Sequence, residues 1–276
     1  MASYLTPTGC PVEFTWSSAS NRINTTMELT GRGVTAQNRL SYTTRRLKSV
    51  GVFLDKKELA TIEDMQQGQD LKYGCWLGLK QNKIQPSFKL YIEVPDSRRF
   101  DAMAMIPENW RPAPAGIPTK LDMIGLNTAS GQKEFYFSTH KMQPKHLPSI
   151  MKPVNLSHRW ESVIIAVEEL WGWPAFKHLP GTQHGYSYSA LSTGPVFSLF
   201  LFAEDLFADD ARLRTAVLQL GEKRGWPTTI YERLTKPLNT AAHGKMTHGI
   251  CTISIMEAGD PIYSIGFPPP QKNYPK

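Results

Sequence analysis

Five pairs of short strand-like segments constrain the fold of this 276-residue chain more than any other feature. Within a segment, apolar and polar residues alternate, and the turns carry the Gly, Asn, Asp or Ser that a chain reversal needs. The expected pairs are residues 11–16 with 26–30, 71–80 with 87–94, 120–127 with 132–139, 186–191 with 196–202, and 247–256 with 262–267. Each pair predicts a β-hairpin, so we expect ten antiparallel strands.

The segments between the hairpins have the spacing of amphipathic helices. Apolar residues fall on one face in residues 59–65, 158–171 and 205–220. A hairpin followed by a helix therefore recurs about every 50 to 60 residues, except after the last hairpin. Ten alternating strands with helices outside them fit a closed barrel. We predict a single α+β domain over residues 1–276, in which residues 268–276 form a poorly ordered tail.

The alternation within the strands predicts a polar interior for this barrel. In residues 87–94 the even-numbered positions are all apolar, whereas the odd-numbered positions are Ser87, Lys89, Tyr91 and Glu93. Helices bury an apolar strand face, so the polar face is expected to line the lumen. A polar lumen with aromatic side chains indicates a ligand chamber rather than a packed core.

Composition and cysteine spacing exclude several other classes of protein. The longest apolar stretches, such as residues 196–203, are shorter than the roughly 20 residues of a membrane span. Cys10, Cys75 and Cys251 are far apart, which favours free thiols over a disulfide framework or a zinc site. The N-terminus lacks the basic head and apolar run of a secretory signal, so we expect a cytoplasmic protein with no membrane partner.

The chain carries 31 Lys and Arg against 24 Asp and Glu, a formal net charge of +7. An excess of this size suits a nucleic acid, a membrane surface or an anionic small molecule. Nucleic-acid binding needs a contiguous outer basic stripe, but the bases here are scattered and Lys89 is predicted to point inward. We therefore expect no nucleic-acid partner.

Several stretches of the sequence resemble one known family. They are residues 22–30, the Lys89-Leu-Tyr91 strand, residues 132–137 and Tyr263-Ser-Ile-Gly266, of which the Lys-x-Tyr strand is the most specific. Together they resemble the soluble aromatic prenyltransferases of the ααββ (ABBA) barrel type. The match is better to the bacterial enzymes for phenols, naphthalenes and phenazines than to the longer fungal indole enzymes. The resemblance spans most of the chain and implies a ten-stranded barrel ringed by helices.

The resemblance also implies roles for individual residues. Lys89 would bind the isoprenoid diphosphate, and Tyr91 and Tyr136 would stabilise the allylic cation through their ring faces. Glu134 could take the proton that the prenylated ring loses, as could a hydroxyl, water or the diphosphate. Further candidates for substrate and diphosphate binding are Arg22, Glu28, Thr30, Lys72, Tyr188, Lys245 and Tyr263.

The family includes both metal-dependent and metal-independent members, so Mg²⁺ is a possible cofactor and not a required one. Glu28, close to Thr30, could contact Mg²⁺ or an N–H or O–H group of the acceptor, and both alternatives remain open. The chain departs from the family pattern at the third hairpin. Ser130 and Gly131 stand where a further Lys or Arg is usual. Either the diphosphate pocket is less cationic than is usual in the family, or its positive charge comes from Lys245, Lys72 or Arg22.

The predicted function is prenyl transfer in secondary metabolism. A dimethylallyl or geranyl group would pass from its diphosphate to an aromatic small molecule by Friedel–Crafts C-prenylation, or to oxygen or nitrogen. A phenolic acceptor is slightly favoured over naphthalene-type, phenazine or indole compounds, and a monomer is expected. The alternative is a noncatalytic barrel of the same fold that binds an aromatic ligand.

Overall fold

The computed structural model describes residues 2–29, 34–80, 86–112, 116–240 and 246–270. Ten antiparallel strands form one closed barrel in the order β1-β10-β9-β8-β7-β6-β5-β4-β3-β2. The strands are β1 (Val12–Ser17), β2 (Ser20–Met27), β3 (Cys75–Lys80), β4 (Ser87–Glu93), β5 (Thr119–Asn127), β6 (Lys133–His140), β7 (Gln183–Leu191), β8 (Gly194–Phe202), β9 (Ile250–Met256) and β10 (Ile262–Phe267). The predicted barrel of five hairpins is confirmed.

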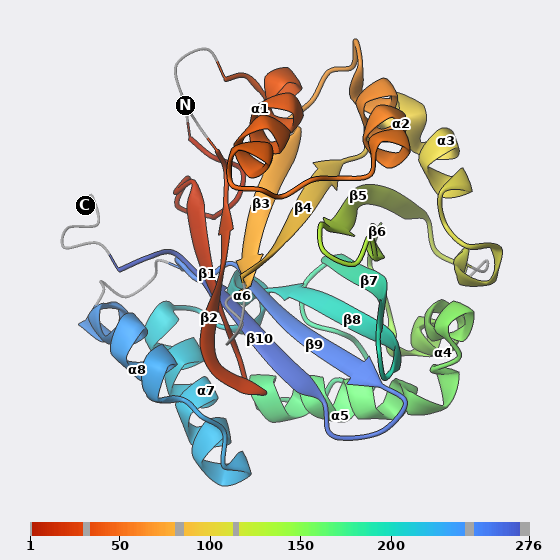
Figure 1. The fold of residues 1–276 in the computed structure, drawn as a ribbon. Coiled ribbons are helices and arrows are strands. Elements are labelled where there is room, and N and C mark those ends of the chain that lie inside the picture. Colours follow the sequence, from red (N-terminus) through yellow and green to blue (C-terminus); the bar gives the residue numbers. More distant parts are fainter. Residues whose placement is uncertain (1, 30–33, 81–85, 113–115, 241–245, 271–276) are drawn as a thin grey trace.

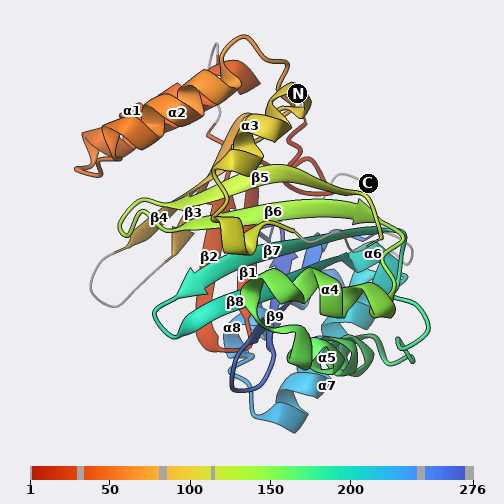
Figure 2. The ribbon, with the colours of Figure 1, turned by 90° about the vertical axis from the view of Figure 1, so that its right-hand side faces the viewer.

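Helices surround the barrel on the outside, as Figures 1 and 2 show. They are α1 (Ala36–Ser49), α2 (Lys56–Gln66), α3 (Arg99–Ala104), α4 (Leu147–Met151), α5 (Trp160–Trp171), α6 (Ala203–Leu206), α7 (Asp210–Arg224) and α8 (Thr229–Thr235). The predicted helix over 158–171 corresponds to α5. The one predicted over 205–220 is divided between α6 and α7, because residues 207–209 leave the helical path.

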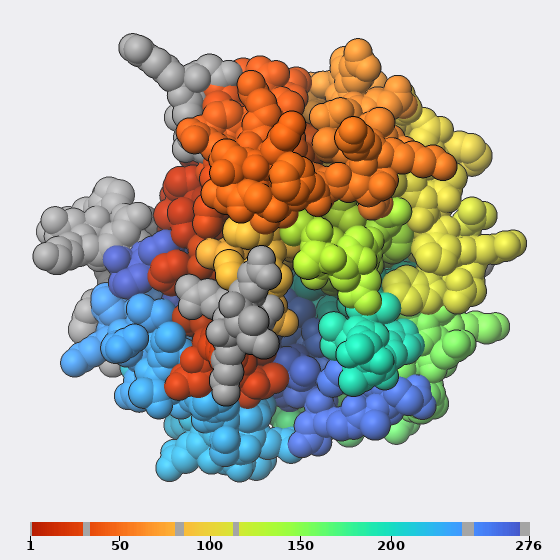
Figure 3. Space-filling view, in the orientation of Figure 1, coloured from red at the N-terminus to blue at the C-terminus, as the bar shows by residue number. Residues whose placement is uncertain are grey.

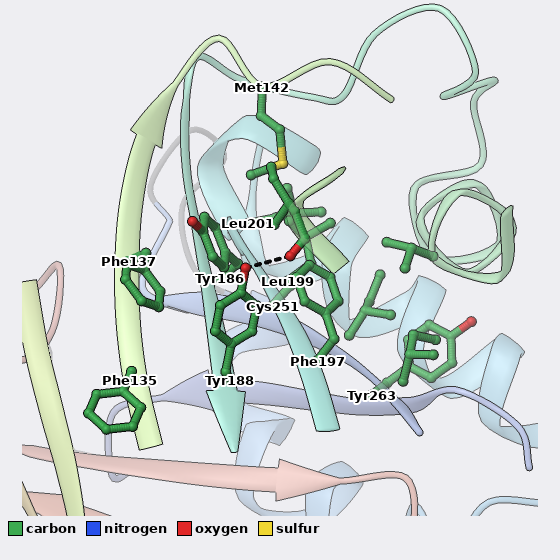
Figure 4. Close-up of a cluster of buried hydrophobic side chains, with 14 of the residues drawn as sticks. Phe135, Phe137, Met142, Tyr186, Tyr188, Phe197, Leu199, Leu201, Cys251 and Tyr263 are labelled. Carbon is green, nitrogen blue, oxygen red and sulfur yellow. Dashed lines mark hydrogen bonds between the residues drawn. The ribbon is translucent and has the colours of Figure 1, made fainter. Parts of the chain in front are cut away.

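The outward faces of the strands and the inward faces of the helices form the hydrophobic core. Fully buried outward residues include Trp16, Leu90, Ile92, Ile124, Phe135, Phe137, Phe197, Leu199, Ile253 and Ile265. Trp16, for example, packs its ring 5.2 Å from that of Tyr231 on α8. Figure 4 shows part of this core between the β6 to β8 wall and the helices. Because alternate residues face opposite sides of a sheet, the polar positions of the same strands face the lumen.

The second strand begins earlier than the sequence predicts. The sequence predicts the turn within residues 17–24, but β2 runs from Ser20, and Thr15 on β1 pairs with Asn24. The polar residues Arg22, Asn24 and Thr26 occupy alternate positions of this strand, and the side that carries them faces the lumen. Only Ser18 and Ala19 separate the two strands.

None of the helices in the described part of the chain is long and apolar enough to cross a bilayer. Residues 271–276, which make up most of the expected tail, lie outside the described residues.

Candidate functional site

Strand register brings together the four residues that the sequence analysis places at the reaction centre. Lys89 and Tyr91 alternate along β4, and Glu134 and Tyr136 alternate along β6. β5 lies between these strands, with Gly125 paired to both Tyr91 and Glu134. All four side chains therefore reach the lumen across a strand that offers only a glycine at this position.

The Lys89 ammonium is the centre of this cluster. It forms an ion pair with the Glu134 carboxylate and a hydrogen bond of 2.9 Å to the Tyr136 hydroxyl. The same nitrogen lies 5.0 Å from the centre of the Tyr91 ring and 5.2 Å from that of Tyr136. Both distances lie within the range of cation–π attraction. The two ring faces thus already attract a positive charge at this point of the pocket wall.

Two strand glycines make room for these side chains. A Cβ on Gly125 would lie 2.5 Å from Cε of Lys89, and one on Gly78 would lie 2.8 Å from the Tyr91 ring. Glycine within a strand often marks such a close approach. Gly78 and Gly125 are therefore part of the site, although the sequence analysis did not select them.

A cavity of about 300 Å³ opens from this cluster toward the hairpin tips. Its lining includes Thr15, Asn24, Thr26, Gly78, Lys80, Ser87, Lys89, Tyr91, Asn127, Lys133, Glu134, Ser189 and Leu191. The tips of the β5–β6 and β7–β8 hairpins, yellow-green and teal, lie side by side on the face shown in Figure 3. The expected polar ligand chamber is present at this end of the barrel.

Charge and burial shift the proton affinities of the cluster. Burial lowers the pKa of Lys89, but the nearby Glu134 carboxylate more than offsets it, and the net pKa is above its ordinary value. Burial first, and then the charge of Glu134, raises the pKa of Tyr136 well above the usual range. At neutral pH the lysine is charged and the tyrosine is a neutral hydrogen-bonding group.

Glu13 is a buried acid at a lumen-facing position of β1 that the sequence analysis missed, although it does not line the cavity itself. It lies on β1, and Thr15, the next residue of the same parity, lines the cavity. Burial raises the pKa of Glu13 to about 8, so its carboxyl is mostly protonated at neutral pH and can donate a hydrogen bond. Gly249 and Gly266 face it closely, since a Cβ on either would lie within 2.8 Å of its Oε1. The sequence could have indicated it, because Glu13 is an acidic residue on the side of the first strand that faces the lumen.

Glu28 occupies a different environment from the one expected. Its Oε1 pairs with Arg39 of α1 at 2.8 Å, and its Oε2 accepts hydrogen bonds from Ser3 (2.7 Å) and Trp76 (3.2 Å). Three donors take up the carboxylate, so Glu28 does not fit the role of a magnesium ligand, and no catalytic step is assigned to a metal. No cluster of three or more metal-binding side chains occurs in the described ranges.

Tyr188 and Tyr263 lie on the outer side of the barrel wall, which corrects their expected position in the chamber. The Tyr188 hydroxyl donates to the backbone carbonyl of Ile150 on α4, and its ring packs among Phe137, Tyr186 and Phe197 (Figure 4). The Tyr263 hydroxyl donates to Glu169 on α5 at 3.0 Å. Both tyrosines occupy strand positions whose side chains point outward into the apolar core. They therefore stabilise the fold and cannot screen a cation in the lumen.

The remaining candidates are scattered. Arg22 is partly buried on β2 at the lumen parity, next to Asn24 of the cavity wall. Lys72 is exposed in the segment before β3, where its backbone N–H donates to Glu93. Thr30 and Lys245 lie outside the described residues.

The barrel is similar in fold to several solved structures. Prenyltransferase PriB has a TM-score of 0.74 and 13% sequence identity, over 99% of this chain and 85% of that chain. The fold is that of the aromatic prenyltransferases. A 6-dimethylallyltryptophan synthase from Micromonospora olivasterospora, solved with DMASPP and Trp, has a TM-score of 0.71 and 16% identity over 96% of this chain and 84% of its own. The 5-dimethylallyltryptophan synthase of Streptomyces coelicolor has a TM-score of 0.68 and 12% identity, with 96% and 83% covered.

Comparisons based on sequence found no relative of the chain. No protein-family model matches the chain, and no curated protein matches it. Identities of 12–16% establish the fold alone. The activity must therefore be argued from the side chains in the lumen.

Proposed function

We propose that this chain transfers a prenyl group from an isoprenoid diphosphate to an aromatic small molecule held in the barrel. One observation carries the proposal: Lys89 lies in the lumen within cation–π distance of Tyr91 and Tyr136, beside a carboxylate. An anion-binding group and two aromatic faces are what ionisation of an allylic diphosphate needs.

Each residue of the cluster has a distinct task in this proposal. Lys89 stabilises the negative charge that develops on the leaving diphosphate. The faces of Tyr91 and Tyr136 stabilise the allylic cation by about 0.5 to 2 kcal/mol each and help to exclude water. Glu134 takes the proton from the ring once the new bond has formed. No metal is assigned a step.

The size and polarity of the chamber bear on the substrates. A cavity of about 300 Å³ is at the small end of ligand pockets, which favours the shorter dimethylallyl group over geranyl. The solved complex of the Micromonospora enzyme contains Trp, so indoles belong in an acceptor panel beside the phenols that the sequence analysis slightly favours.

The test is a turnover assay. The purified protein is incubated with dimethylallyl, geranyl or farnesyl diphosphate and with phenols, naphthols, phenazines or indoles, with and without Mg²⁺, and products are identified by mass. We expect a prenyl mass increment. Lys89→Ala should lower kcat/KM at least about 100-fold, because it removes charge stabilisation of the leaving group. Lys57→Ala, the same change at an exposed residue of α2, should leave it unchanged.

A noncatalytic aromatic-binding barrel is the second candidate. The observation in its favour is that the Glu134 carboxylate already neutralises Lys89. It predicts saturable binding of an aromatic compound without product from any donor, and that result would replace the enzymatic proposal.

We further propose that residues 1–276 act as one domain, as a monomer in the cytoplasm. Pairing of β1 with β10 supports the single domain, since the barrel closes only when both ends of the chain are present.

A further inference from the structure

The cavity contains less free positive charge than its lysines suggest. Three described lysines line it: Lys89 pairs with Glu134, Lys133 pairs with Glu58 of α2 at 2.7 Å, and Lys80 is exposed at the end of β3. Among the described residues of the lining, Glu134 is the one acid. It lies on the lysine to which the proposed function assigns the donor diphosphate.

Glu134 is held from two sides. Its Oε2 contacts the Lys89 ammonium, and its Oε1 accepts a hydrogen bond of 2.5 Å from the Ser187 hydroxyl on β7. Ser187 is not bonded to Lys89, so the carboxylate can keep this partner when it leaves the lysine. Lys89 retains its hydrogen bond to Tyr136 in that event.

The ion pair compensates two charges that are mostly buried. The side chains of Lys89 and Glu134 are only 25% and 16% exposed. A charge that is buried without a partner is strongly destabilising, so a counter-ion keeps the lysine charged and in place before a ligand arrives. A bound anion close to Lys89 takes over that function, and the carboxylate would then repel it.

We propose that Glu134 is an internal counter-ion that the diphosphate of the donor must displace from Lys89. This inference rests on the proposed function and adds a determinant of specificity to it. A diphosphate carries several negative charges and competes with the carboxylate for Lys89. An anion with a single charge gains no more from Lys89 than Glu134 already does, so Glu134 selects diphosphates over monoanions.

Binding of inorganic pyrophosphate, measured by isothermal titration calorimetry, tests the inference without turnover. We expect Glu134→Gln to bind pyrophosphate about tenfold more tightly than the wild type, since a charged competitor is removed. Glu134→Asp keeps the charge and should stay within about twofold of the wild type, as should Glu63→Gln, the same change at an exposed residue of α2. In Lys89→Ala/Glu134→Gln the gain should disappear. Circular dichroism verifies that each variant is folded.

Equal or weaker binding by Glu134→Gln overturns the inference, as does a gain that survives the loss of Lys89. The outcomes separate this inference from the proposed function. Turnover that requires Lys89, together with no gain in Glu134→Gln, overturns the counter-ion alone. A gain in affinity without product from any donor overturns the enzymatic proposal alone. If none of the proteins binds pyrophosphate, both are overturned.

Discussion

The Glu13 carboxyl shows how the absence of neighbouring side chains can shape a group's chemistry. Gly249 and Gly266 approach it where any larger residue would collide with it. The carboxyl is thereby enclosed by backbone and loses hydration, which raises its pKa from 4.5 to about 8. A proton is retained on an acid that would be ionised in water.

Replacing Glu13 by Gln should change how stability depends on pH. Between pH 4.5 and about 8, the folded wild type keeps a proton that the unfolded chain has already released. The stability of the wild type therefore falls as the pH rises through this window. Gln cannot ionise, and the variant should be more stable than the wild type by about 4 kcal/mol at pH 8. Urea unfolding at pH 5 and pH 8 measures the difference. A gap that stays constant between the two pH values would contradict the assigned pKa.

Glycines within strands determine the geometry of the site at the scale of secondary structure. β5 separates β4 from β6, yet Lys89 and Glu134 meet across it because Gly125 has no side chain. Gly78 on β3 similarly accommodates the Tyr91 ring. One residue of a strand therefore decides whether side chains of its two neighbours can interact.

Gly125→Ala is expected to reduce activity more than stability. The new methyl group would lie 2.5 Å from Cε of Lys89 and 3.1 Å from the Tyr136 ring, so the flexible lysine must move away from Glu134. We expect kcat/KM to fall about tenfold, while the free energy of unfolding changes by less than about 1 kcal/mol. Urea unfolding and the turnover assay are compared for this variant and the wild type. A loss of stability that accounts for the whole loss of activity would argue against the role of Gly125.

The whole molecule is held together by contacts between barrel and helices that are distant in sequence. Asp210, the first residue of α7, accepts hydrogen bonds from the backbone N–H groups of Thr247 and His248 at 2.9 and 3.0 Å. It also accepts from the Thr247 hydroxyl at 2.7 Å and pairs with His248 Nδ1 at 2.6 Å. The start of β9 and the helical layer are thereby joined at one buried carboxylate.

Asp210→Asn should destabilise the entire fold. Burial tends to raise the pKa of Asp210, but its hydrogen bonds and the charge of His248 lower the pKa below 3.8. The wild type therefore has this contribution to stability above about pH 4 and loses it as the pH falls further. At pH 7 the variant should lose about 3 kcal/mol, and its stability should vary less between pH 4 and pH 2. Thermal unfolding measures both effects, with Asp64→Asn, an exposed acid of α2, as control. A small effect at pH 7 would show that the network is dispensable.

The local pattern of the chain was sufficient to predict the ten strands of the closed barrel, apart from the start of β2, and the face on which its central residues lie. The alternation of polar and apolar residues shows which face of a single strand is polar, without information from other strands. The polar face of β4 carries Lys89 and Tyr91, and that of β6 carries Glu134 and Tyr136. The same pattern does not say which face a tyrosine occupies, because its ring is apolar and its hydroxyl polar. The outward positions of Tyr188 and Tyr263 depend on partners in α4 and α5.

Only the tertiary structure determined which charged side chains pair with one another and which residues enclose them. Arg39 of α1 removes Glu28 from the set of available ligands, and two glycines from the last hairpin region enclose Glu13 on the first strand. The pairing of Lys89 with Glu134 depends on the register of β4, β5 and β6. Periodicity is a property of neighbouring residues, whereas pKa values and ion pairs depend on groups that only closure of the barrel brings together.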